Sequence, residues 1–172
     1  MEQYILDFIN STKFKNIAPE FKILQGDLKN FKDKSLQNNK GIYFLYCNIL
    51  GHVSYIGSTE KGFSSRFDRH IGRSEGKIYD KNQISKNWDY VAEWVKDTKY
   101  DYRNKGKYIC VNFEGEITKK QLQRLETRAV HELWPLINDD TFDEGEIIFE
   151  KIKEDVTKKM LAEKENSLFN FV

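Results

Sequence analysis

The chain has 172 residues, of which 39% are apolar and 14% aromatic, and its 28 basic and 27 acidic side chains leave a net charge of +1. This length can bury a real core, and so many aromatic residues exclude a chain that is disordered throughout. No apolar run approaches the roughly 20 residues that cross a bilayer, and residues 1–10 lack a signal-peptide pattern, so we expect a soluble, cytoplasmic protein without a membrane partner.

The first 40 residues differ in composition from those that follow. Apolar residues recur at helical spacing in residues 2–9, which predicts a short helix. Residues 11–40 are polar and rich in loop-forming residues, with a few large apolar side chains. We interpret residues 1–40 as an N-terminal flank that packs on the core.

A β-hairpin is predicted next. Residues 41–48 (GIYFLYCN) and 52–59 (HVSYIGST) are rich in β-branched and aromatic side chains, and a turn containing Gly51 separates them.

In each of these strands a glycine lies two residues from a tyrosine, and therefore on the same face. The pairs are Gly41 with Tyr43 and Tyr55 with Gly57. We expect uncovered backbone at both glycines, where a ligand can approach, although ordinary aromatic packing in a strand is an alternative.

Residues 61–72 carry an apolar side chain at every fourth position, which predicts a short helix. Arg66 and His70 form a neighbouring stripe, four residues apart. An arginine beside a titratable imidazole suits a phosphate-binding site, and the alternative is a solvated helix face.

Residues 75–107 form a polar insert in which aromatic side chains alternate with basic ones, and a further strand follows from Tyr108. Basic groups with interleaved aromatics suit contact with nucleic acid, while some of the aromatics would cover the core. The candidate DNA-binding residues of the insert are Lys77, Lys81, Lys86 and Arg103.

A helix is predicted after Thr118, which with Gln121 makes a capping box, and Pro135 ends it. Glu126 lies on the apolar stripe of this helix. A carboxylate there should meet an arginine, a lysine or a metal ion, or else swing out to solvent.

The balanced total charge hides a polarised chain. Residues 61–110 hold 12 basic and 7 acidic side chains, whereas residues 139–172 hold 5 basic and 10 acidic ones. A helix is predicted in this acidic C-terminal extension. The basic middle is compatible with an anion-binding surface, and equally with a solvated face.

Taken in order, these residues resemble the motif of the GIY-YIG nucleases. Gly41-Ile42-Tyr43 is followed after 11 residues by Tyr55-Ile56-Gly57, and then come the elements R-x3-H, E-x8-P and P-x2-N. The matching positions in those three elements are Arg66, His70, Glu126, Pro135 and Asn138.

The resemblance implies an α+β protein of the GIY-YIG fold, with a small three-stranded antiparallel sheet flanked by helices and with N- and C-terminal helical extensions. The nuclease core would be residues 41–138, interrupted by the insert at 75–107. Residues 1–40 and 139–172 lie outside the resemblance.

The resemblance also implies roles for individual residues. Glu126 matches the glutamate that binds one Mg²⁺ (or Mn²⁺) per active site, and Arg66 matches the arginine that contacts the scissile phosphate. Tyr43 matches the tyrosine proposed as general base. Because an ordinary tyrosine is protonated at pH 7, we hypothesise that His70 relays its proton.

The remaining matches are supporting residues. Tyr55 resembles a positioning hydroxyl, and Asn138, with Gly41 and Gly57, belongs to a surrounding layer that holds the strands or Glu126. Lys61 follows the motif directly and either contacts phosphate or is solvated.

These matches predict a metal-dependent DNA endonuclease, a hydrolase acting on double-stranded DNA, similar to the small site-specific restriction enzymes of the family. A double-strand cut would need a homodimer or sequential nicks. The alternatives are a homing, phage-type or structure-directed nuclease, or a nucleic-acid-binding module that has lost its chemistry. The full set of motif residues argues against that loss.

Overall fold

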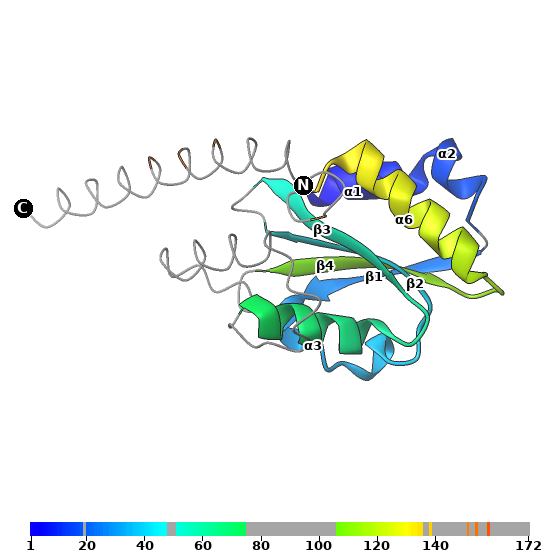
Figure 1. The fold of residues 1–172 in the computed structure, drawn as a ribbon, viewed down its shortest axis with the longest axis horizontal. Coiled ribbons are helices and arrows are strands. Elements are labelled where there is room, and N and C mark those ends of the chain that lie inside the picture. Colours follow the sequence, from blue (N-terminus) through cyan, green and yellow to red (C-terminus); the bar gives the residue numbers. More distant parts are fainter. Residues whose placement is uncertain are drawn as a thin grey trace, which may run out of the picture.

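The computed structural model describes residues 1–18, 20–47, 51–74, 106–135 and 138, together with Lys151, Glu154 and Lys158. An antiparallel sheet of four strands in the order β1-β4-β2-β3 is covered by helices on both faces (Figure 1). The elements are α1 (Glu2–Asn10), α2 (Thr12–Lys15), β1 (Phe21–Asp27), the 3-10 turns η1 (Leu28–Asn30) and η2 (Lys34–Leu36), β2 (Gly41–Cys47), β3 (His52–Thr59), α3 (Phe63–Ser74), β4 (Lys107–Phe113) and α6 (Lys119–Leu133). No helix among the described residues is long and apolar enough to cross a membrane.

The predictions of an α+β protein and of a hairpin over residues 41–59 are confirmed. β2 and β3 pair antiparallel, with Tyr43 opposite Gly57 and Gly41 opposite Thr59, and β4 pairs with the other side of β2. A register shift after Leu45 places a bulge near the turn of the hairpin. Among the strands that the structure describes, β3 therefore lies at the edge of the sheet, with β2 as its partner.

The expected three-stranded sheet is wrong, because residues 21–27 add a fourth strand. β1 pairs with β4 over its whole length, from Phe21 opposite Phe113 to Asp27 opposite Lys107. None of its seven residues is fully buried. A strand at the edge of a sheet buries little, so its sequence lacks the dense apolar signal of β2 and β4.

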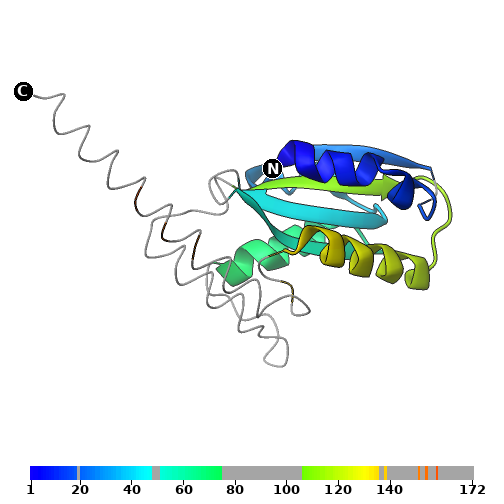
Figure 2. The same ribbon diagram turned by 90° about the horizontal axis from the view of Figure 1, so that it is seen from above.

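One face of the sheet carries the larger core. Alternate residues of β2, β3 and β4 meet the buried stripes of α1, α2 and α6 there (Figure 2). The helix predicted at residues 2–9 is confirmed as α1, which buries Ile5 and Ile9. The first 40 residues thus supply both helices and a strand to the core.

The opposite face is covered by α3 and by the segment that contains η1 and η2 (Figure 1). Phe63 and Phe67, the apolar stripe predicted for α3, pack edge-on against the ring of Tyr43, at centroid distances of 6.2 and 5.4 Å. Phe67 also contacts Tyr108 of β4. This aromatic layer fixes α3 on the sheet beside β2 and β3.

The predicted capping box of α6 is also confirmed. The Thr118 hydroxyl accepts the backbone N–H of Gln121, and the Gln121 side chain accepts the backbone N–H of Thr118. The helix ends at Leu133, one residue before a left-handed Trp134 that precedes Pro135. α6 thus crosses the sheet face with a defined start, which sets the position of Glu126.

Candidate functional site

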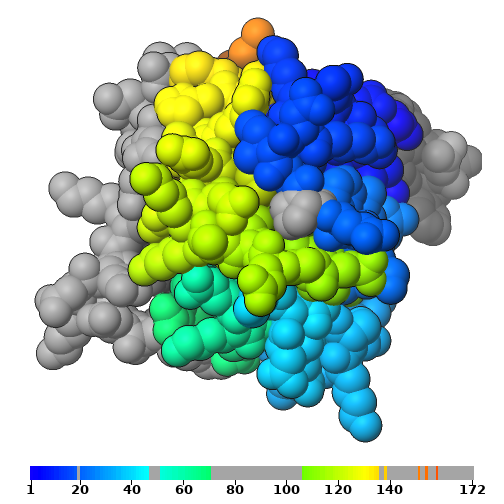
Figure 3. Space-filling model, turned by 90° about the vertical axis from the view of Figure 1, so that its right-hand side faces the viewer, coloured from blue at the N-terminus to red at the C-terminus, as the bar shows by residue number. Residues whose placement is uncertain are grey.

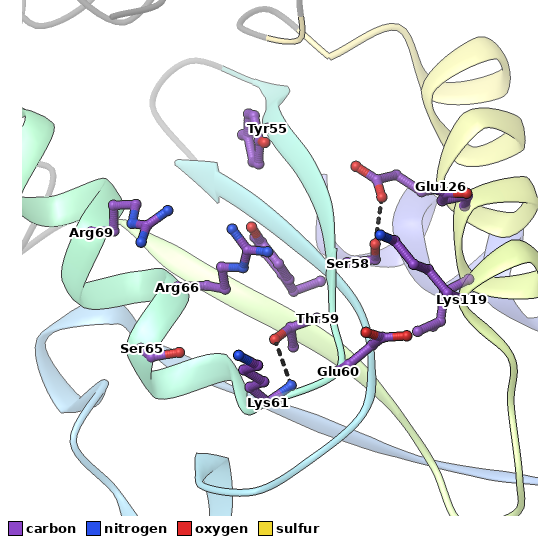
Figure 4. Close-up of a pocket in the computed structure, with 13 residues that line it drawn as sticks. Tyr55, Ser58, Thr59, Glu60, Lys61, Ser65, Arg66, Arg69, Lys119 and Glu126 are labelled. Carbon is purple, nitrogen blue, oxygen red and sulfur yellow. Dashed lines mark hydrogen bonds between the residues drawn. The ribbon is translucent and has the colours of Figure 1, made fainter. Parts of the chain in front are cut away.

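A pocket of about 480 Å³ lies at the open edge of β3, between α3 and α6. Side chains reach it from both sides of the sheet: Arg66 and Arg69 extend from α3, and Glu126 and Lys119 extend from α6 (Figure 4). β3 itself supplies residues in the space between the two helices. The site therefore depends on an edge strand, since a further paired strand would fill this space.

Tyr43 and His70 meet at the floor of the site. The Tyr43 hydroxyl lies 2.8 Å from Nε2 of His70, and both side chains are buried. The ring of Tyr55 lies 4.6 Å from the His70 ring and 6.1 Å from the Tyr43 ring. Three residues predicted from the sequence as candidate catalytic groups thus form one contact cluster.

The environment of Tyr43 favours its protonated form. Burial raises the pKa of the Tyr43 phenol well above its usual value, and the neighbouring Tyr55 and Glu126 raise that pKa further, while Arg66 lowers it. A free phenolate is therefore a costly state for this residue. Any proton that Tyr43 accepts would have to be matched by a proton that it gives up, and the imidazole of His70 is within hydrogen-bond distance for that transfer.

Glu126 faces the pocket rather than bulk solvent. The Ser58 hydroxyl donates a hydrogen bond of 2.5 Å to Oε2 of this carboxylate, and the contact joins α6 to β3 across 68 residues of sequence. Ser58 was not predicted as a site residue. Its donation stabilises the ionised form of Glu126 and fixes the direction of the carboxylate.

The residues around Glu126 fit a magnesium ion held in the manner usual for that ion. No group of three or more histidine, cysteine or acidic side chains that could form an all-protein cage occurs among the residues that the structure describes. Mg²⁺ is commonly held by one or two carboxylates, with water and substrate phosphate oxygens as the other ligands. A half-buried carboxylate that opens into a roomy pocket matches that requirement.

Basic side chains surround the same pocket. Arg66 was predicted from the motif and Lys61 from its place just after Tyr55-Ile56-Gly57, whereas Arg69 and Lys119 were not predicted. All four are exposed at the surface, so their charges act in a solvated cleft rather than in a dry interior. These four basic side chains outnumber the two acidic ones, Glu60 and Glu126, so the charge of the pocket lining favours an anion.

The turn from β3 to α3 positions two of these basic side chains, Lys61 and Arg66. The Thr59 hydroxyl donates to the carbonyl of Gly62 and accepts the backbone N–H of Lys61. Gly62 has φ of +123°, and a Cβ at this position would press on the backbone nitrogen of Asn38. A glycine is therefore needed for α3 to start here, with Lys61 and Arg66 at the mouth of the pocket.

The open edge of β3 is partly closed by Asn138. Its side-chain oxygen accepts the backbone N–H of Ile56 at 2.9 Å, and its side-chain nitrogen donates to the carbonyl of Ile56 at 2.7 Å. One amide thus replaces a neighbouring strand at a single residue. The contact lies between Tyr55 and Gly57, so Asn138 holds the strand that carries these residues.

The two motif glycines make room for protein atoms and not for a ligand. A Cβ at Gly57 would overlap the Tyr43 hydroxyl, and a Cβ at Gly41 would overlap the carbonyl oxygen of Val111. The prediction of uncovered backbone at these positions is wrong for that reason. Gly57 instead allows the phenol of Tyr43 to cross the strand toward His70.

Some predicted residues fall outside the described part of the chain. These are the DNA-binding candidates Lys77, Lys81, Lys86 and Arg103, and the acidic extension 139–172 apart from its three described positions.

Comparison of the chain with models of protein families, with curated proteins and with solved structures finds no match in any of the three.

Proposed function

We propose that this chain is a metal-dependent endonuclease that hydrolyses DNA phosphodiester bonds, with a core of the GIY-YIG type to which β1 is added. The observation that carries the proposal is that Tyr43, Arg66 and Glu126, from three separate elements, line one pocket, with His70 in hydrogen-bond contact with Tyr43. These residues are far apart in the sequence, where only their spacing links them, but their side chains lie close together in the folded protein.

The Tyr43–His70 pair is suited to removing a proton from an attacking water. Tyr43 lines the pocket, while the imidazole of His70 stands behind its hydroxyl. As the phenol accepts the proton of the water, its own proton passes to Nε2 of His70, so that no free phenolate forms. This pathway is consistent with burial that holds the pKa of Tyr43 well above its usual range.

Arg66 and its neighbours are suited to the phosphate. A guanidinium offers a planar fork of donors to two phosphate oxygens, and its charge opposes the negative charge that grows in the transition state. Arg66 and Arg69 are three residues apart on one helix, and both line the pocket. Lys61 and Lys119 enclose the same volume from two other segments.

Glu126 would hold the metal ion, and Ser58 would orient its carboxylate. A bound Mg²⁺ or Mn²⁺ supplies Lewis-acid polarisation of the phosphate and stabilises the leaving oxygen. For the substrate class we propose double-stranded DNA cut at specific sites, with a homodimer or two successive nicks giving the double-strand break.

A plasmid digest tests the proposal. Wild-type protein with Mg²⁺ should nick or linearise supercoiled DNA, and Glu126→Gln should lose this activity while folding normally, because the amide cannot replace a charged metal ligand. Glu116→Gln is the matched control, since Glu116 is exposed and lies outside the pocket. The proposal fails if wild-type protein binds DNA but shows no metal-dependent cutting, and equally if Glu126→Gln cuts at the wild-type rate. Sequencing the ends of the products then shows whether cutting occurs at discrete sites.

A further inference from the structure

The outward face of α6 carries a row of positive charge that the proposed chemistry does not use. Lys120, Arg124 and Arg128 follow one another at intervals of four residues, so they lie on one stripe of the helix. Lys120 and Arg124 are exposed, and Arg128 is half-buried. We call these three residues the α6 basic stripe.

The stripe is not neutralised within the described part of the protein. None of the ion pairs found there includes a member of the stripe. Of the two acidic residues of α6, Glu126 accepts a hydrogen bond from Ser58 in the pocket. Glu132 lies four residues after Arg128 on the exposed side of the helix, where it pairs with Lys13 at 3.5 Å. Like charges four residues apart destabilise a helix slightly, so the row has a cost that a bound anion would remove.

The stripe borders a groove that joins the proposed active site. This groove has a volume of about 620 Å³ and runs between α6 and the residues after α2. Figure 3 shows the N-terminal segment in blue and α6 in yellow-green as neighbouring parts of the surface. Gln123 lines both the groove and the active-site pocket, so the two hollows lie side by side on α6. Thr127 and His131 add further polar groups to the groove, and Glu132, which pairs with Lys13, adds its one acidic side chain.

We infer that the α6 basic stripe binds the phosphate backbone of the DNA whose scissile bond enters the pocket. The inference rests on the proposed function and adds a second contact surface to it. Eight residues of helix rise about 12 Å, and one strand of duplex DNA presents a phosphate about every 3.4 Å along its axis. The stripe therefore matches about three to four phosphates in length. Guanidinium, ammonium, amide and hydroxyl groups are the usual donors to such a backbone.

An acidic peptide is the competing occupant, and residues 139–172 of the same chain have that composition. Continuity with the pocket favours DNA. A strand whose phosphate reaches Arg66 and Glu126 must pass beside α6, since Glu126 and Gln123 both project from this helix into the pocket.

Binding of a labelled DNA duplex to the full chain, measured in EDTA so that no cutting occurs, tests the inference. The variant Lys120→Gln/Arg124→Gln/Arg128→Gln should bind more weakly. The slope of log affinity against log salt should become about 2.7 less negative if three phosphate contacts are lost. Between about 50 and 200 mM salt, the wild-type affinity should thus fall about 40-fold more than that of the variant. Lys120→Arg/Arg124→Lys/Arg128→Lys should keep the wild-type slope, because counterion release depends on charge.

The control removes three charges elsewhere: Lys29→Gln/Lys32→Gln/Lys34→Gln changes exposed lysines of the η1–η2 segment, on the opposite face of the sheet (Figure 1). It should keep the wild-type slope. The inference is overturned if the stripe variant and the wild type have the same slope and affinity. It is also overturned if the stripe variant binds more tightly, because that result assigns the stripe to an acidic segment. If the wild type cuts DNA and the stripe variant is unchanged, only this inference fails. If the wild type neither binds nor cuts DNA, the proposed function fails with it.

Discussion

The contact between Tyr43 and His70 gives a specific meaning to two residues that are ordinary when read separately. A buried tyrosine in a strand is usually a packing residue, and a histidine on a helix is usually a surface residue. Here the phenol is nearly inaccessible and lies 2.8 Å from the imidazole. Burial opposes ionisation of the phenol. A role in proton transfer therefore requires both partners, and the hypothesis of a relay can be tested on His70.

We predict that His70→Gln lowers the cleavage rate by about 10²- to 10⁴-fold, the usual effect of removing a general base. An amide at this position still offers a hydrogen bond to Tyr43 but cannot take its proton. Imidazole is the side chain that ordinarily titrates between pH 5 and 8. The low-pH limb of the rate profile should therefore disappear along with most of the rate, while the thermal unfolding temperature changes little.

Single-turnover cleavage measured across this pH range, with DNA affinity measured in EDTA, checks the prediction. His52→Gln is the matched control, because His52 lies near the hairpin turn and, within the described residues, its ring hydrogen-bonds to the carbonyl of Val53 and not to Tyr43. A His70→Gln variant with the wild-type rate and pH profile would show that the relay does not operate.

Among individual residues, those that belong to the motif could be predicted from the sequence, whereas pocket residues outside the motif were missed. Tyr43, Arg66 and Glu126 were found because their spacings match a family pattern. Ser58 was missed because it is an unremarkable strand residue whose contact with Glu126 spans 68 positions. Lys119 was missed for a related reason, since a lysine at the start of a helix indicates solvent exposure unless the neighbouring strand is known.

Among the elements, β3 decides whether the site exists. It carries Tyr55 and Ser58, it has a partner strand on only one side, and the edge that it leaves open is the wall of the pocket. An exposed edge strand is prone to slip or to pair with other chains. Asn138 limits that risk at Ile56 while leaving the part of the strand that faces the pocket uncovered.

We predict that Asn138→Ala lowers the free energy of unfolding by about 2 kcal/mol, because two backbone groups of Ile56 lose their partners at a nearly buried position. Asn138→Asp should be at least as destabilising. Its carboxylate can still accept the N–H group, but it has no donor for the carbonyl and places a negative charge against it. Cleavage should fall more than DNA affinity, since the strand that bears Tyr55 and Ser58 is loosened.

Urea unfolding of the variants checks this prediction. The control is Asn39→Ala, which removes a side-chain hydrogen bond to the carbonyl of Ser35 at an exposed site and should have an effect below about 0.5 kcal/mol. Equal stability of Asn138→Ala and wild type would mean that water replaces the amide at no cost.

Most of the helices and strands of the fold could be predicted from the sequence, but one strand could not. The strands β2 and β3, the helix α3 and the capped helix α6 were predictable because each has a strong local pattern of apolar, aromatic or capping residues. β1 was not. Its residues alternate weakly and include Gly26 and two charged side chains. They gain their strand structure from pairing with β4, at least 80 residues away. Propensity at a sheet edge is overridden by such tertiary pairing.

For the whole molecule, the total charge of +1 is a poor guide to its partners. Residues 111–138 hold four basic and four acidic side chains. The net charge of this segment is therefore zero and predicts no charged surface. Folding separates most of the signs: Glu126 turns into the pocket, while the α6 basic stripe stays at the surface, where Glu132 is the one acidic residue of the helix and pairs with Lys13. A charge count along the chain cannot anticipate this separation, because it depends on which face of α6 the sheet covers.

The buried phenol and thiol groups make the stability of the whole fold sensitive to alkaline pH. Burial raises the pKa of Tyr43 and of Cys110 well above their usual values, and it raises the pKa values of Tyr46 and Tyr108 as well. In the unfolded chain a thiol titrates near pH 8.5 and a phenol near pH 10. Stability from these groups is therefore fully present below those values and is lost as the pH rises above them.

We predict that the free energy of unfolding is flat from about pH 7 to 8 and then falls, at about 1.4 kcal/mol per pH unit for each fully buried group that stays neutral in the native state. The fall should steepen above about pH 10, where unfolded phenols begin to ionise. Urea unfolding at a series of pH values measures this slope. Tyr43→Phe should make the slope above pH 10 shallower by about 1.4 kcal/mol per unit, because the variant has no phenol to ionise when the chain unfolds. The exposed Tyr4 provides the control, and Tyr4→Phe should leave the slope unchanged. If Tyr43→Phe has the wild-type slope, Tyr43 ionises in the native state as readily as in the unfolded chain, and the reason for requiring His70 as its proton acceptor is removed.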